Sequence, residues 1–212
     1  MAKSKRRRRM LRRYTSLPCL LDLLTSRKLT LLPPSSWDDK NDAFYLEQYK
    51  SKKNLKAVYA LCFTESNETY HHWRVFSRDN VGVCVTFVHS ELMSYLDAIP
   101  EITCRDVDYY RTDELEAHPP RIEDLPFVKR QAFKDEREHR VLYSDDRDIS
   151  LSKSIGIGLE CIYKVTVNPW LPAGLFPSIK ATIRTIDHCS SLKVYRSTLL
   201  ETDRWKNVAL RA

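Results

Sequence analysis

Hydrophobic and polar positions switch repeatedly between two periods along the chain. Over residues 16–29 leucines recur at helical spacing, with Ser16 as an N-cap and Pro18 in the first turn, where a missing N–H group is harmless. Segments rich in β-branched and aromatic residues, which is typical of strands, lie at 10–16, 56–66 and 81–87. The pattern predicts strands and short helices in irregular succession.

The rest of the chain continues in the same style. Residues 47–55 are polar and are expected to be exposed, and 67–80 are expected to form one or two helical turns. Loops are predicted at 30–44 and 112–126, where prolines and polar residues cluster. The other predicted helices are 89–99, capped by Ser90, 126–135 and 175–187, and the other predicted strands are 102–111, 138–144, 159–169 and 191–199.

Length and composition favour a single domain. A chain of 212 residues with 42% hydrophobic content is long enough to bury a core of its own. We therefore predict an α+β fold, one compact domain of mixed, mainly antiparallel strands with short helices, over residues 11–212. Residues 1–10 are expected to form a flexible basic arm.

The net charge of +7 comes from one end of the sequence. Residues 1–13 hold eight basic side chains and no acidic one, so the remainder is close to neutral. Such a block is either a solvated tail or a contact for phosphates, an acidic partner or an anionic surface. The candidate nucleic-acid-binding residues are Lys5, Arg6, Arg7, Arg8 and Arg9.

Several classes of protein are disfavoured. Four glycines leave no room for a glycine-rich nucleotide loop. The apolar run after the basic block is interrupted by Pro18 and Asp22, so an export signal is not expected. No run approaches the length of a membrane span. Six scattered cysteines without metal-ligand spacing favour a reduced, cytoplasmic protein without a bound metal.

The segment "FKDEREHRVLY" carries the clearest candidate chemistry. If it enters a strand, Glu136, Glu138 and Arg140 share one face, and His139 and Val141 lie on the other. If it is helical, the same charges form a salt-bridged, solvated face. Two carboxylates desolvated together would have perturbed pKa values and would be candidates for catalysis, so both interpretations stay open here.

The order of several short words resembles a widespread bacterial family catalogued as a domain of unknown function. These words are "LRRYTSL", "LTSRKLTLLPPSSWDDKND", "LCFTES…HHWRVFSRDNVGVCVTF", "FKDEREHRVL" and "VNPWLP…SLKVYRSTL". That family is in turn similar to the arginine-serine-glutamate branch of the ADP-ribosyltransferase superfamily. Three departures from that branch are a missing glycine after Arg13, "TES" in place of serine-threonine-serine, and His139-Arg140 after the second glutamate.

The resemblance implies an ADP-ribosyltransferase-like fold and specific roles. Glu138 would stabilise the charge that develops on the ribose of NAD, and Glu136 would orient or deprotonate the acceptor. Arg13, with Thr15 nearby, would hold the dinucleotide, and Thr64 and Ser66 would support Glu138 or the ribose. The aromatic candidates for stacking on NAD are Trp37 and Trp73, although a role in the core or at a hinge is the more common one for large aromatics.

The expected activity is transfer of ADP-ribose from NAD to RNA or DNA by a toxin or phage-defence effector. A protein acceptor stays open, and a cognate antitoxin or inhibitory partner is expected. One alternative is a non-catalytic module that binds nucleic acid or a partner through the basic arm. Another is a magnesium-dependent nuclease built on Asp38, Asp42, Glu136 and Glu138, and Asp38, Asp39 and Asp42 are otherwise turn formers.

Overall fold

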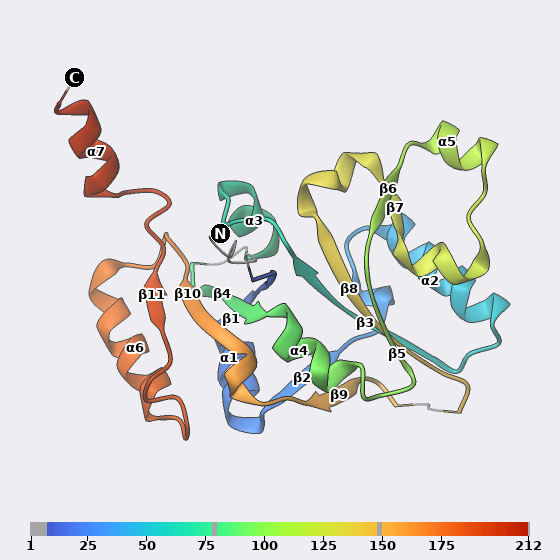
Figure 1. The fold of residues 1–212 in the computed structure, drawn as a ribbon, viewed down its shortest axis with the longest axis horizontal. Coiled ribbons are helices and arrows are strands. Elements are labelled where there is room, and N and C mark those ends of the chain that lie inside the picture. The colour runs from blue at the N-terminus through green and yellow to red at the C-terminus, as the bar shows by residue number, and fades with distance from the viewer. Residues whose placement is uncertain (1–7, 78–79, 148–149, 212) are drawn as a thin grey trace, which may run out of the picture.

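A seven-stranded sheet organises the molecule (Figure 1). The structure, a computed structural model, describes residues 8–77, 80–147 and 150–211. Neighbouring strands are antiparallel except for one parallel pair, β10 with β11. The strand order is β11 (Val194–Arg196), β10 (Ile162–Val167), β4 (Gly82–Val88), β1 (Met10–Ser16), β3 (Ala57–Thr64), β8 (Glu138–Asp145) and β5 (Ile102–Asp106). The predicted α+β class with mainly antiparallel strands is confirmed.

The sheet divides into two groups of strands at its centre. Strand β1 pairs with β4 at seven positions, from Met10 to Ser16. It pairs with β3 at a single position, Arg12 opposite Thr64. Figure 1 shows the two groups spreading apart beyond this point. Because the two central strands meet at one position only, backbone hydrogen bonds do not close the space between them beyond that point.

Two short sheets complete the strand structure. Strand β2 (Lys28–Leu31) pairs antiparallel with β9 (Lys153–Gly156). Strand β6 (Asp108–Tyr110) pairs parallel with β7 (Val128–Arg130). The second pair lies in the long segment between β5 and β8. It places Tyr109 and Lys129 next to Glu138, the first residue of β8.

Short helices pack around the sheet. The α-helices are α1 (Leu17–Ser26), α2 (Lys40–Lys52), α3 (Tyr70–Phe76), α4 (His89–Leu96), α5 (Thr112–Ala117), α6 (Phe176–Thr185) and α7 (Asp203–Ala209). The 3₁₀ turns are η1 (Pro34–Ser36), η2 (Ile122–Phe127), η3 (Gln131–Glu136), η4 (Leu159–Cys161) and η5 (Ala173–Leu175). No described helix is long and apolar enough to cross a bilayer.

Helix α1 has the start that the sequence predicts. The Ser16 hydroxyl accepts a hydrogen bond from the Cys19 N–H, and a proline occupies the first turn. Its buried face consists of Leu20, Leu23 and Leu24. Each such leucine contributes roughly 1.5–3 kcal/mol by leaving water, so this face fixes α1 on the main core.

Several local predictions are wrong, among them the loop at 112–126, which contains α5 and η2, and the end of the helix at 16–29, where β2 begins. The polar stretch expected as loop and exposed chain contains α2, whose helical pattern is weak because only Asp42 and Leu46 are buried. The helix predicted at 126–135 is instead β7 followed by η3, because pairing with β6 extends residues 128–130. Ser90 does not cap α4. The helix begins at His89, its N-cap residue is Val88, and no side chain forms a capping hydrogen bond.

Candidate active site

A hollow of about 390 Å³ opens where β1 and β3 separate. This volume is within the range of small-molecule sites, about 300–1,000 Å³. Its walls come from β1, β3, the η1–α2 segment, the end of α3 and the segment before β8. The charged lining side chains are Arg12, Arg13, Asp38, Asp39, Asp42, Lys129, Glu136 and Glu138.

Glu138 is the first residue of β8 and is 5% exposed. Its backbone N–H donates to the Tyr109 hydroxyl over 2.8 Å. Its carboxylate accepts from Arg140 Nε at 2.6 Å and from Lys129 Nζ at 3.2 Å. Burial alone would raise the pKa of Glu138, but the charges of Arg140 and Lys129 lower that pKa to about 2. The site therefore holds an ionised carboxylate.

Arg140 fixes the position of this carboxylate. It is fully buried and forms two parallel bonds to Asp42, Nη1 to Oδ1 at 2.9 Å and Nη2 to Oδ2 at 2.7 Å. Nη1 also donates to the Pro126 carbonyl, and the guanidinium lies 4.9 Å from the centre of the Trp37 ring. A planar fork that is bonded on several sides holds one orientation, so Arg140 fixes the position of Glu138.

Lys129 joins the carboxylates on the other side. Its ammonium lies 2.6 Å from Glu136 Oε2 and 3.6 Å from Asp42 Oδ2. Burial raises the pKa of Glu136, although the positive charge of Lys129 opposes that rise. The two glutamates of the hollow therefore differ in basicity, because Glu136 binds a proton more readily than Glu138.

The two glutamates come together in a way that the strand interpretation does not anticipate. Glu136 ends η3, outside β8, and only Glu138 and Arg140 share a face of the strand. Between the glutamates, Arg137 has a left-handed backbone with φ 43°. This turn, together with the Lys129 bridge, brings Glu136 to the hollow. The expectation of three same-face residues is thus wrong for Glu136, and the fully solvated interpretation is wrong for Glu138.

Arg13 reaches the hollow from β1. Its guanidinium donates a long bond, 3.4 Å, to the Cys62 carbonyl. Among the residues that the structure describes, Arg13 makes no ion pair, and burial lowers its pKa. A cation in this state is suited to bind an anion in the hollow. Thr15, two residues further along β1, is not among the lining residues.

Thr64 and Ser66 hold the chain near the carboxylates. The Thr64 hydroxyl donates to the Glu136 carbonyl and accepts from the Ser66 N–H. The Ser66 hydroxyl donates to the Asp135 carbonyl at 2.9 Å. Thr64 lines the hollow, whereas Ser66 does not. Both residues therefore fasten the end of η3 to β3 and position Glu136.

The two tryptophan candidates have different surroundings. Trp37 lines the hollow next to Arg140. Trp73 is fully buried, packs edge-on against Tyr14 at 4.9 Å and donates from Nε1 to Glu68. A ring that is covered in this way cannot stack on NAD, so the predicted contact of Trp73 is corrected to a core position. The aromatic ring that α3 does present to the hollow is Phe76.

The predicted nucleic-acid contacts are only partly described. Lys5, Arg6 and Arg7 lie outside the described residues. Arg8 is exposed, and Arg9 forms ion pairs with Glu65 and Asp106. Arg9 is thus fixed to the body of the protein and is not a member of a free arm.

The nuclease alternative has little support from this geometry. Asp42 and Glu138 already lie against Arg140 and Lys129, and these fixed positive charges would repel a magnesium ion. Across the described ranges, no group of three His, Cys, Asp or Glu side chains has the arrangement of a metal site. One of these charges, Arg140, was visible in the sequence two residues after Glu138, whereas Lys129 was not singled out there.

Comparison with solved structures identifies the architecture. No family model and no curated protein matches the sequence. The structure of Thermus sp. 2.9 DarT in complex with ADP-ribosylated ssDNA matches with a TM-score of 0.50, covering 95% of this chain and 100% of that chain at 9% identity. The chain has a DarT-like fold. The ADP-ribosyltransferase-like architecture is thereby confirmed, whereas membership of the bacterial domain family stays a prediction.

Two further structures of the same Thermus sp. 2.9 protein also match. The complex with NAD+ has a TM-score of 0.48 at 8% identity, covering 94% of this chain and 100% of that chain. The complex with carba-NAD+ has a TM-score of 0.48 at 10% identity, covering 92% and 99%. At these identities the likeness concerns the fold alone.

Proposed function

We propose that this protein transfers ADP-ribose from NAD to a nucleic acid in the hollow between β1 and β3. The observation that carries the proposal is the buried, ionised carboxylate of Glu138, which lines that hollow together with the cationic Arg13 of β1. One side chain is suited to stabilise positive charge on a sugar and the other to bind a phosphate. Both belong to the pattern that the resemblance assigns to NAD.

The reaction requires one bond to break and one to form. The bond between nicotinamide and the ribose anomeric carbon breaks, and nicotinamide leaves with the bonding electron pair. A lone pair of the acceptor forms the new bond to that carbon. Positive charge develops on the sugar in the transition state, as in glycoside cleavage. Glu138, held by Arg140 and Lys129, stabilises this charge more in the transition state than in the ground state.

Glu136 is the proposed base. Its pKa is raised by burial, so it accepts a proton more readily than an ordinary glutamate, and the proton lost by the acceptor is assigned to it. Lys129 holds Glu136 and Glu138 in a fixed relation through its contacts at 2.6 and 3.2 Å. Lys129 therefore acts as a positioning residue.

The remaining roles concern the binding of NAD. Arg13 is assigned to the phosphates, because its guanidinium has no carboxylate partner among the described residues. Trp37 and Phe76 are assigned to contacts with the flat rings. Thr64 supports Glu136 through its carbonyl, and Ser66 supports the preceding residue.

The nucleic-acid acceptor has two sources of support. The Thermus sp. 2.9 protein with the same fold was captured with ADP-ribosylated ssDNA. The basic residues before β1 would also raise the encounter rate with a polyanion. An intracellular enzyme that modifies nucleic acid is damaging unless restrained, so we assign the protein to the toxin or defence class, with a cognate inhibitory partner in the cytoplasm.

The test measures label transfer and nicotinamide release together. Purified protein is incubated with labelled NAD and, separately, ssDNA, duplex DNA, RNA and total protein. We expect label on one nucleic acid and a loss of about 10²- to 10³-fold in Glu138→Gln, because an electrostatic contribution of this kind is worth about 3–4 kcal/mol. Glu47→Gln is the matched control, because Glu47 is exposed on α2.

Folding of the variant is checked by circular dichroism and urea unfolding. Glu138→Asp keeps the charge but shortens the side chain, and it should retain the fold with reduced transfer. Wild-type protein that is folded yet neither labels any acceptor nor releases nicotinamide would refute the proposal. That result would favour a module that binds nucleic acid or a partner without catalysis.

A further inference from the structure

A second hollow adjoins the candidate active site. It has a volume of about 360 Å³ and lies between α2 and the β6–α5–β7 segment. We propose that this hollow binds the acceptor base of a single-stranded nucleic acid and presents it to the ribose of NAD. The inference rests on the proposed transferase function and identifies where its acceptor binds.

The two hollows share a thin wall. Lys129 and Asp42 line both, and their charged atoms lie 3.6 Å apart. Their side chains are 9% and 2% exposed. Glu136, the proposed base, contacts the same ammonium at 2.6 Å from the NAD side. A group in the second hollow is therefore one layer of side chains away from the carboxylates.

In the parallel β6–β7 pair, Tyr109 and Tyr110 point to opposite faces of the strands. Tyr109 lies opposite Lys129 in the register, and its hydroxyl accepts from the Glu138 N–H. Successive side chains of a strand point to opposite faces. Tyr110, opposite Arg130, accordingly lines the second hollow. The ladder thus links the start of β8 to the proposed acceptor site.

The composition of the second hollow fits a base better than a phosphate. Tyr45, Tyr110, Pro119 and Pro120 supply flat apolar surfaces, and Tyr110 is 37% exposed. Bases stack on such rings with little dependence on sequence. Two carboxylates, Asp39 and Glu116, also line the hollow. They repel phosphates and are able to accept hydrogen bonds from the amino groups of a base.

The position of Arg130 explains where the phosphates would lie. Arg130 is exposed at the hollow, and its guanidinium lies 5.4 Å from the centre of the Phe133 ring. It forms no ion pair among the residues that the structure describes. A base inserted between the tyrosines would leave its phosphate near this guanidinium.

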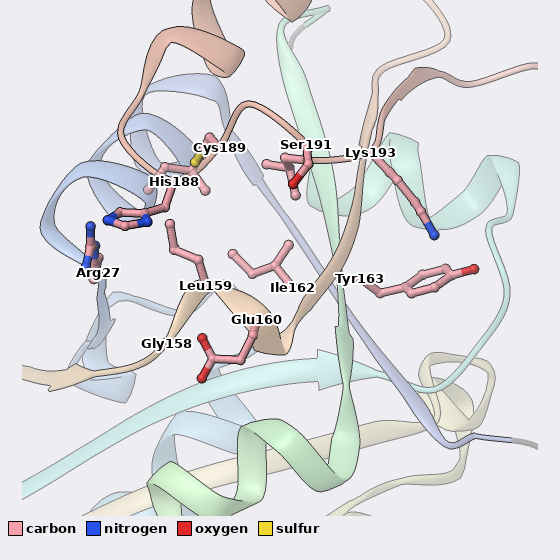
Figure 2. Close-up of a pocket in the computed structure, with 12 residues that line it drawn as sticks. Arg27, Gly158, Leu159, Glu160, Ile162, Tyr163, His188, Cys189, Ser191 and Lys193 are labelled. Atoms are coloured by element: carbon pink, nitrogen blue, oxygen red, sulfur yellow. The ribbon is translucent and has the colours of Figure 1, made fainter.

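A third hollow, shown in Figure 2, supplies the control. It has a volume of about 500 Å³ and shares no lining residue with the other two. Its Arg27 and His188 already contact Asp187, at 3.0 and 3.1 Å. Tyr163 lies at its edge, 43% exposed, with the Lys193 ammonium 4.7 Å from the centre of the ring. Tyr163 is thus matched to Tyr110 in exposure but is remote from Glu138.

The experiment compares Tyr110→Ala with Tyr163→Ala. Binding of fluorescent single-stranded DNA and RNA oligonucleotides is measured by anisotropy, and nicotinamide release is measured without oligonucleotide. For Tyr110→Ala we expect affinity for the accepted oligonucleotide to fall about tenfold to a hundredfold, which corresponds to the loss of one stacked base. Nicotinamide release to water should stay at the wild-type level. Tyr110→Phe keeps the aromatic ring and should bind the oligonucleotide like wild type. Tyr163→Ala should change neither oligonucleotide affinity nor nicotinamide release.

The two readouts separate the two proposals. Wild-type oligonucleotide affinity in Tyr110→Ala would overturn the acceptor site, whatever the rate of nicotinamide release. An equal loss of nicotinamide release would also overturn it, since it would show a general effect on the NAD site. Label found on protein in place of nucleic acid would overturn the nucleobase assignment. Absence of both nicotinamide release and label transfer in wild-type protein would refute the transferase function itself.

Discussion

The properties of the site depend first on four charged residues, of which Asp42, Glu138 and Arg140 are buried and Lys129 is 9% exposed. Arg140 bonds Asp42 on one side and Glu138 on the other, and Lys129 contacts both carboxylates. Burial of charges is unfavourable unless each has a partner of opposite sign in good geometry. The two cations therefore stabilise the ionised form of Glu138, and the group keeps that carboxylate anionic inside the protein.

Replacement of Arg140 tests this dependence. Arg140→Ala would leave Asp42 and Glu138 buried without their main partner, so we expect the free energy of unfolding to fall by about 3–5 kcal/mol. Urea unfolding at neutral pH measures the change. Arg121→Ala is the control: Arg121 also binds an aspartate, Asp124, but its side chain is 79% exposed, and the expected change is within about 0.5 kcal/mol.

The pH dependence of transfer tests the roles of the two glutamates. The pKa of Glu136 is raised by burial, so its base form is lost as pH falls through a value above that of an ordinary glutamate. We expect activity to decline on the acid side over that range, and Glu136→Gln to remove this decline along with most activity. A pH–rate profile under single-turnover conditions provides the measurement. A decline that persists in Glu136→Gln would assign the base elsewhere.

Protonation of Glu138 should be visible in the pH dependence of the free energy of unfolding. Its pKa is about 2 in the folded protein, below the unfolded value near 4.3. A lowered pKa contributes stability that is present above the unfolded value and is lost as pH falls through the folded one. Acid unfolding of wild-type protein should therefore steepen between about pH 4 and 2. Glu138→Gln should show a smaller change over the same range.

At the level of elements, the turn between η3 and β8 sets the distance between the glutamates. Arg137 occupies the left-handed region, with φ 43°, and its N–H donates to the Lys134 carbonyl. With this turn, Glu136 lies beside Glu138 at Lys129. The hydroxyls of Thr64 and Ser66 hold the same turn against β3.

Substitution at Arg137 tests the turn. A β-branched residue is strongly disfavoured at positive φ, so Arg137→Val should lower stability by about 1–2 kcal/mol and reduce transfer by moving Glu136. Glycine adopts this conformation freely, and Arg137→Gly also removes the exposed ion pair with Glu65. Activity retained in the glycine variant and reduced in the valine variant would assign the effect to the backbone. Equal loss in both would assign it to the guanidinium.

At the level of the whole molecule, the basic residues before β1 precede a remainder of the sequence that is close to neutral. Deletion of residues 1–8 removes five basic side chains and leaves Arg9 paired with Glu65 and Asp106. If these side chains contact phosphates, the slope of log affinity for single-stranded nucleic acid against log salt should fall by up to about 3.5. Nicotinamide release to water should be unchanged. An unaltered slope would show that the segment is not a contact.

Local sequence patterns determined the elements that depend on near neighbours. Strand β1, the capped helix α1 and strands β3, β4 and β8 follow from short-range alternation, leucine spacing and a capping serine. The sequence also pointed to Glu138 and to Arg140 on the same strand face. Weak helical patterns failed, as α2 shows, because its contacts with other elements rather than a broad apolar face hold it in place.

The tertiary structure alone decided which groups meet. Arg140 and Asp42 are 98 positions apart, and Thr64 and Glu136 are 72 apart, so no local pattern connects them. Local patterns also did not predict that Lys129 lines two hollows, that Trp73 lies in the core, or that Arg137 forms a left-handed turn. The sequence specified which residues carry charge, whereas folding brought these charges together out of water, and the pKa values follow from that arrangement.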